Sequence, residues 1–64
     1  MKKLATELHP GDVIQQKYYR GAVVKRLFKC SEPTCVGVVV EYSVRGRTYT
    51  AELYPRRTAS YEVD

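Results

Sequence analysis

Cys30, Cys35 and His9 are the residues best suited to bind a metal ion. Four residues separate the two cysteines, a spacing that a zinc site can use. A structural zinc ion needs four ligands, however, and His9 is the only histidine of the chain, so a single copy falls short of a full set. Two copies together could supply four thiolates. For the single chain we expect no metal and no cofactor, with both cysteines acting as small apolar side chains.

No group of residues has the pattern of a catalytic site. His9 stands beside a Pro10-Gly11 turn, no serine or cysteine is tied to it by a recognisable motif, and the acidic residues are scattered singly. A glycine-rich phosphate loop is also absent. We predict that the protein is not an enzyme.

Basic residues are interleaved with tyrosines along the chain, as in proteins that bind single-stranded nucleic acid. Cations contact the phosphates, while the bases stack on aromatic rings. The predicted contacts with RNA or single-stranded DNA are Lys17, Tyr18, Tyr19, Arg20, Arg45, Arg47, Tyr54, Arg56 and Arg57. The alternative is a surface without a ligand, because tyrosine is common in strands and paired arginines protect strand edges from aggregation.

Six tyrosines without a tryptophan also fit a protein-binding surface. A groove of the SH3 or Tudor kind would use Tyr18, Tyr19, Tyr54 and Tyr61, and the domain would then dock on a larger protein complex by this face or by a strand edge. A third alternative is a structural subunit that assembles with itself. Its small core would gain stability from a homo-oligomer.

Size and charge place the chain among small globular domains. It has 64 residues, of which 44% are hydrophobic, and a formal net charge of +4, which mildly favours acidic partners. No apolar run is long enough to cross a membrane, and residues 4–10 lack the apolar stretch of a secretory signal. We therefore expect a cytoplasmic location without membrane contact, in which Cys30 and Cys35 remain reduced thiols.

The clearest structural signal is a hairpin between Val36 and Tyr54. Apolar and polar residues alternate on both sides of Arg45-Gly46, as in two half-buried strands joined by a two-residue turn. This turn predicts that one face carries three pairs: Tyr42 with Tyr49, Val40 with Ala51, and Val38 with Leu53. The other face then carries Glu41 with Thr50 and Val39 with Glu52.

The preceding strand, Val23 to Cys30, can pair with this hairpin in two registers. In the first, Cys30 lies opposite Cys35, and the two could form a disulfide under oxidation. In the second, Phe28 faces Val38, Val24 faces Tyr42 and Lys25 faces Glu41, while Cys35 lies in the loop. We favour the second, because it aligns Ala22, Val24, Phe28 and Cys30 with the buried face of the next strand. It forces Arg26 to reach the rim of the sheet, and it leaves Leu27 beside Val39 on the outer face.

The remaining segments complete a small all-β domain. Residues 1–8 are expected to be a flexible lead-in to a single domain over 9–64, and Ala59 to Val63 a closing strand. The segment Asp12 to Arg20 allows either a short helix, with Asp12 and Gln15 as a capping box, or a strand. With the strand, the count is five, arranged as an SH3-like barrel or a strongly twisted antiparallel sheet.

Gly11-Asp12-Val13-Ile14, followed by Tyr19-Arg20-Gly21-Ala22-Val23-Val24-Lys25-Arg26-Leu27, resembles the KOW motif of SH3-like small β-barrels. In that motif an opening Gly-Asp strand leads through a glycine turn into a Val-rich second strand. The resemblance implies a strand over the first part of Asp12 to Arg20. It also implies contacts with RNA or with other proteins, as KOW modules make in ribosomal proteins and transcription factors.

Overall fold

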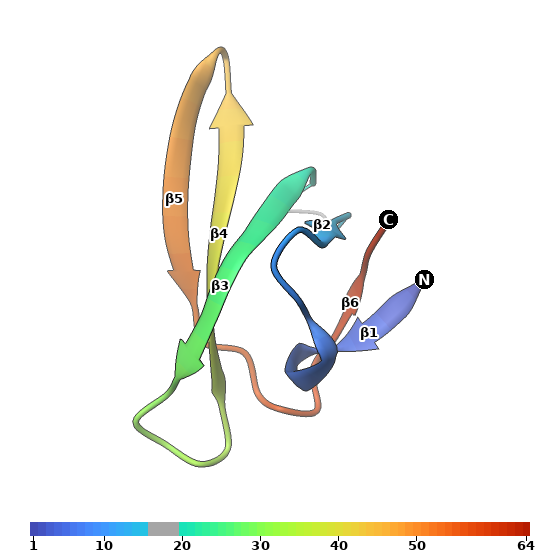
Figure 1. The fold of residues 1–64 in the computed structure, drawn as a ribbon, viewed down its shortest axis with the longest axis vertical. Coiled ribbons are helices and arrows are strands. Elements are labelled where there is room, and N and C mark those ends of the chain that lie inside the picture. The colour runs from blue at the N-terminus through green and yellow to red at the C-terminus, as the bar shows by residue number, and fades with distance from the viewer. Residues whose placement is uncertain (16–19) are drawn as a thin grey trace.

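The computed structural model describes residues 1–15 and 20–64 of an all-β chain (Figure 1). Its elements are β1 (Lys2–Leu4), the 3-10 turn η1 (Ala5–Glu7), β2 (Val13–Ile14), β3 (Ala22–Lys29), β4 (Val36–Val44), β5 (Arg47–Leu53) and β6 (Ser60–Glu62). Every strand pairing is antiparallel. The predicted all-β class is confirmed. The sheets are not closed into a barrel, so a twisted antiparallel sheet is the architecture that fits.

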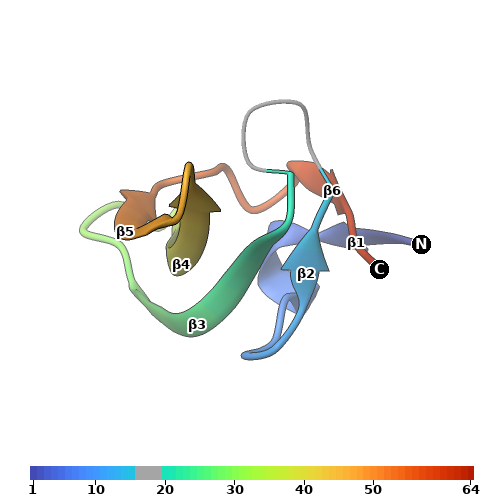
Figure 2. The same ribbon diagram turned by 90° about the horizontal axis from the view of Figure 1, so that it is seen from above.

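The strands form a two-stranded sheet, β1–β6, and a four-stranded sheet, β2–β3–β4–β5. A bridge between Ile14 and Val63 joins the two sheets, because it places the end of β6 beside β2. The Gln15 N–H donates to the Glu62 carbonyl over 2.8 Å, and the Asp64 N–H donates to the Val13 carbonyl over 3.0 Å. The resulting order is β1–β6–β2–β3–β4–β5. Seen from above, β1 and β5 lie at opposite ends of a curved layer (Figure 2).

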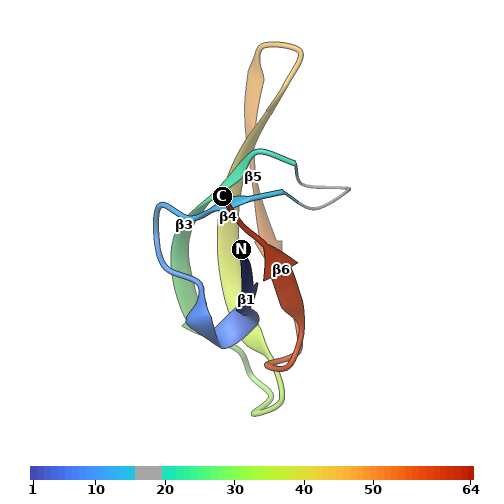
Figure 3. The same cartoon turned by 90° about the vertical axis from the view of Figure 1, so that its right-hand side faces the viewer.

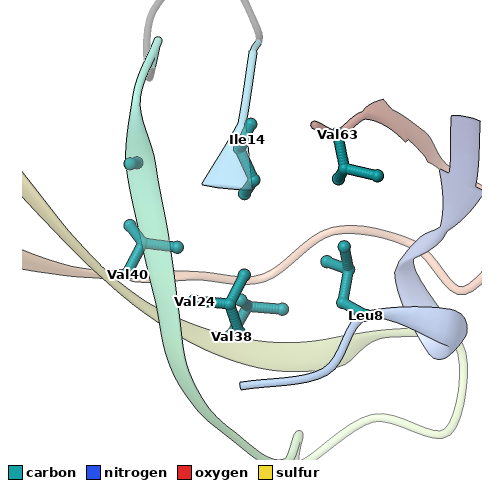
Figure 4. Packing of buried hydrophobic residues seen from close by; sticks show 7 residues of the cluster. Leu8, Ile14, Val24, Val38, Val40 and Val63 are labelled. Carbon is teal, nitrogen blue, oxygen red and sulfur yellow. The ribbon is translucent and has the colours of Figure 1, made fainter. Parts of the chain in front are cut away.

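The core lies inside this curve and consists mainly of small and β-branched side chains (Figure 4). Such side chains pack well on a pleated surface. The largest side chains that are fully buried are Ile14, Val24, Val38 and Val40. Leu8, Ala22 and Val63 complete the cluster. Ala22 and Val24 of β3, and Val38 and Val40 of β4, are inward-facing residues two positions apart, so the alternating pattern of these two strands supplies much of this small core.

Residues 1–8 belong to this fold. Lys3 pairs with Tyr61 in the β1–β6 ladder, and Ala5 and Leu8 are buried, with 0% and 3% of their surface exposed. The Lys3 ammonium also lies 3.1 Å from the Asp12 carboxylate. The fold thus includes residues before residue 9, and β1 is the strand that the predicted count of five lacks.

The β4–β5 hairpin has the predicted register along its whole length. Tyr42 pairs with Tyr49, and Val38 pairs with Leu53. At the turn, Arg45 and Gly46 have φ angles of 51° and 80°. Two consecutive left-handed residues are the geometry of the two-residue turns that match the twist of a hairpin. The tip of this hairpin extends beyond the rest of the domain (Figure 3).

The favoured register between β3 and β4 is wrong. Leu27 pairs with Val38, Phe28 with Gly37 and Lys29 with Val36, so the register that aligns Cys30 with Cys35 holds next to the loop. Further along, Val24 pairs with Val40, because the register shifts between Val24 and Arg26.

The shift is a β-bulge, and it explains the positions of the surrounding side chains. One extra residue in a strand reverses the faces to which all later side chains point. Val24 and Leu27 both pack on the core, although three positions separate them, whereas Arg26 is exposed. The bulge thereby removes the difficulty of a buried Arg26. Leu27 consequently lies on the inner face, so the predicted outer pair of Leu27 and Val39 does not form.

Two further predictions concern shorter segments. Val13 and Ile14 form a strand, as the KOW resemblance implies, while residues 16–19 lie outside the described part of the chain. The predicted closing strand is present as Ser60–Glu62.

Candidate binding site at the disulfide end of the sheet

Cys30 and Cys35 form a disulfide at the end of the β3–β4 hairpin, with their Cα atoms 5.8 Å apart. The prediction of two reduced thiols is therefore wrong, because the β-bulge selects the register that places them opposite each other. A disulfide sulfur is not a thiolate, so the bonded pair offers no zinc ligands. The described residues contain no cluster of three or more His, Cys, Asp or Glu side chains that could hold a metal ion.

The chain that follows β5 is fixed against this disulfide loop. Pro55 accepts a hydrogen bond from the Val36 N–H over 3.0 Å, and Arg56 forms a bridge with Cys35. The Arg57 N–H donates to the Thr34 carbonyl, also over 3.0 Å. The β4–β5 pairing thus continues past Leu53, and it holds two consecutive arginines beside the disulfide.

A hollow lies between these two segments. The disulfide loop lines one side, and Tyr54, Arg56, Arg57 and Thr58 line the other. A smaller hollow on the same loop is lined by Phe28, Lys29, Val36 and Arg57. Arg57 and the loop residues are common to both hollows, so we treat the two together as one surface, the disulfide groove.

Three side chains form an aromatic cluster beside the groove. The ring of Tyr54 stands edge-on to that of Phe28, with centroids 5.8 Å apart and planes at 86°. The guanidinium of Arg26 lies 5.5 Å from the Phe28 centroid. Both geometries are attractive, because ring edges and cations are drawn to the electron-rich face of an aromatic ring.

Tyr54 remains accessible within this cluster, with 58% of its surface exposed. Its hydroxyl donates to a carboxylate oxygen of Glu52 over 3.1 Å. This hydrogen bond, together with the negative charge of Glu52, raises the pKa of Tyr54. The ring is therefore anchored at its hydroxyl end while one side faces solvent.

The charges around the groove are predominantly positive. Arg26, Lys29, Arg56 and Arg57 oppose only Glu32 and Glu52, and Glu52 already accepts the Tyr54 hydroxyl. The ion pairs between described residues are Met1 with Glu62 and Lys3 with Asp12, so within this part of the chain no arginine is neutralised. The groove can therefore attract an anionic ligand.

The structure brings together only some of the predicted contact residues. Tyr54, Arg56 and Arg57 line the disulfide groove. Arg45 and Arg47 lie at the opposite end of the β4–β5 hairpin (Figure 1). Seven residue steps separate Arg47 from Tyr54, which is about 23 Å along an extended strand. Arg20 is exposed in the turn before β3, and Lys17, Tyr18 and Tyr19 lie outside the described residues.

Arg26, Phe28 and Lys29 are site residues that the sequence-based prediction missed. The prediction of an unbroken strand placed Phe28 on the buried face. The signal that could have revealed its true position is Arg26, because a cation on an apparently buried face indicates a bulge that moves it outward.

Comparison with known proteins gives no relative: no family model, no curated protein and no solved structure matches the chain. The described part of the chain also contains no helix with the length and apolar character needed to span a membrane.

Proposed function

We propose that the protein is a non-enzymatic accessory module that binds single-stranded nucleic acid, RNA or DNA, in the disulfide groove and on the aromatic cluster. The observation that carries this proposal is the exposed ring of Tyr54, anchored by Phe28 and Glu52 and flanked by arginines that form no ion pair with a described residue.

The chemistry of the groove matches this ligand in two respects. A base stacked on an aromatic ring contributes about 1–3 kcal/mol, and every base has a face that can stack. Phosphates next to that base would lie near Arg56 and Arg57, which the backbone hydrogen bonds to the disulfide loop hold in place. The resemblance of residues 11–27 to KOW modules supports the same class of partner.

The proposal extends to the fold and to the setting. Strands β6, β2, β3, β4 and β5 lie side by side in this order, and we regard them as the five strands of an SH3-like barrel left open between β5 and β6. The Cys30–Cys35 bond fits an oxidising setting better than the cytoplasmic one expected from the sequence, because reducing compartments keep cysteines as thiols.

The test is a titration of fluorescently labelled single-stranded RNA and DNA at low and high salt. Tyr54→Ala should weaken binding about 5- to 150-fold, the equivalent of one lost stacking contact. The double variant R56A/R57A should weaken it and lower the slope of log affinity against log salt by about 1.4, as expected for two lost phosphate contacts on a single strand.

The matched control is R45A/R47A, which removes the same charge from the far end of the hairpin. It should retain most of the affinity. Equal losses in the two double variants would mean that net charge alone attracts the nucleic acid, and the groove would not be the site. No binding at low salt would exclude the function itself.

A further inference from the structure

The outer edge of β5 is the longest strand edge without a neighbour among the described residues. β5 pairs only with β4, and no backbone hydrogen bond joins it to another described element. In an antiparallel edge strand every second residue turns its N–H and C=O away from its neighbour. β1, at the other end of the sheet, is a strand of three residues, whereas β5 has seven. A row of backbone donors and acceptors is therefore available along β5.

Arginines stand at both ends of this edge. Arg45 and Arg47 lie at the hairpin tip, while Arg56 and Arg57 follow the other end. Between them Thr48, Tyr49, Thr50 and Ala51 are uncharged, and the carboxylate of Glu52 accepts the Tyr54 hydroxyl of its own chain. The two cationic ends are about 30 Å apart, at roughly 3.3 Å per residue.

This charge pattern disfavours a second copy of the chain as the neighbour. An antiparallel pairing of two β5 strands about Thr50 would bring the tip arginines of one copy to the same end as Arg56 and Arg57 of the other. A parallel pairing in register would align each pair with its own equivalent. Both arrangements place like charges together, which is destabilising across a strand pair.

We propose that the β5 edge binds an extended segment of another protein, of about nine residues with carboxylates near both ends, which adds to the sheet as a further strand. Main-chain hydrogen bonds to β5 supply the affinity in this mode of recognition, and side chains supply the specificity. The acidic ends of the segment would pair with the two groups of arginines. This surface shares Arg56 and Arg57 with the disulfide groove, and it differs from the groove in the β5 strand edge and the hairpin tip.

The test uses a synthetic peptide with two glutamates at each end and alternating threonine and valine between them, labelled for fluorescence anisotropy. Two control peptides carry either lysines at the ends or prolines in place of the valines. The acidic peptide should bind, and it should slow the exchange of outward-facing amides within Arg47–Leu53. The proline peptide cannot form a strand and should not bind.

The charge-reversal variant R45E/R47E separates this proposal from simple attraction. Both side chains are exposed, so the variant should keep its fold, which circular dichroism can verify. It should bind the acidic peptide about tenfold more weakly and bind the lysine peptide better than the natural chain does.

Three results would overturn the proposal. The first is equal binding of the acidic and lysine peptides by the natural chain. The second is amide protection that falls outside β5. The third is loss of oligonucleotide binding in R45E/R47E without a change in affinity for the acidic peptide. The tip arginines would then bind phosphates and not the peptide.

Discussion

The ring of Phe28 lies over Gly37 on the neighbouring strand, in the space where any other residue would place its first side-chain carbon. A Cβ at position 37 would collide with the ring, so the Phe28 side chain would have to shift. The absence of a side chain at Gly37 therefore allows Phe28 to lie where its ring contacts Tyr54.

Gly37→Ala tests this relationship. The added methyl should destabilise the fold by about 1–3 kcal/mol, as other insertions into filled space do. Urea unfolding monitored by circular dichroism would measure the change. In a Phe28→Leu background the same substitution should cost much less. A similar loss in both backgrounds would show that Phe28 is not the obstacle.

Deletion of Lys25 tests the β-bulge. Without Lys25, Arg26 would follow Val24 directly, and continuous pairing would keep Val24 opposite Val40, Arg26 opposite Val39 and Leu27 opposite Val38. Because every later side chain then keeps its face, we expect the deletion variant to fold with a stability within about 1 kcal/mol of the natural chain. Lys25→Ala is the control and should change the free energy of unfolding by less than about 0.5 kcal/mol. A deletion variant that does not fold would contradict the assignment of Lys25 as the extra residue of the bulge.

Reduction of the disulfide should lower stability. Cys30 and Cys35 are five positions apart, so their bond closes a small loop, and the chain-entropy model gives about 2 kcal/mol for such a loop. Urea unfolding with and without dithiothreitol would measure the difference. C30A/C35A should behave like the reduced protein and should not respond to dithiothreitol, which distinguishes loss of the bond from other effects of the reagent.

Asp12 should make the fold sensitive to acid. Its carboxylate accepts the His9 N–H over 2.8 Å and lies 3.1 Å from the Lys3 ammonium, and these contacts lower the pKa of Asp12. A carboxyl whose pKa is lower in the folded state stabilises that state above its unfolded value of about 3.9. This contribution is lost as the pH falls through the folded pKa.

Unfolding free energies between pH 7 and pH 2 would measure this dependence. Asp12→Asn should be about 1 kcal/mol less stable at pH 7, and its stability should fall less steeply below about pH 4. Glu32→Gln serves as the comparison on an exposed carboxylate at the other end of the sheet. Identical acid profiles for the Asp12→Asn variant and the natural chain would contradict the assignment.

The part of the fold that is predictable from the sequence is the part that local pattern specifies. The alternation from Val36 to Tyr54 is uninterrupted, and the two-residue turn at Arg45-Gly46 leaves one register for β4 and β5. The β3–β4 register is different in kind. It depends on one extra residue near Lys25, which changes no local propensity and becomes visible only when the position of Arg26 is examined.

The errors at the candidate site follow from that single register. The β3–β4 register determines whether Cys30 lies opposite Cys35 and can form the disulfide. It also determines whether Phe28 is a core residue or a neighbour of Tyr54. The interleaving of basic residues with tyrosines predicts Tyr54, Arg56 and Arg57 as contacts, but it cannot show that β5 separates them from Arg45 and Arg47. Distances between basic clusters are a property of the fold, and residue types do not encode them.

The pairing of β1 with β6 has a consequence for the order in which the chain folds. Strands β3, β4 and β5 are joined by short loops, so they can form as a local meander. Lys2, by contrast, pairs with Glu62, which lies near the other end of the chain. Contacts between distant segments carry a larger loop-closure entropy and usually form late. We expect β1 and β6 to dock last, so that substitutions in this pair alter the rate of unfolding more than the rate of folding.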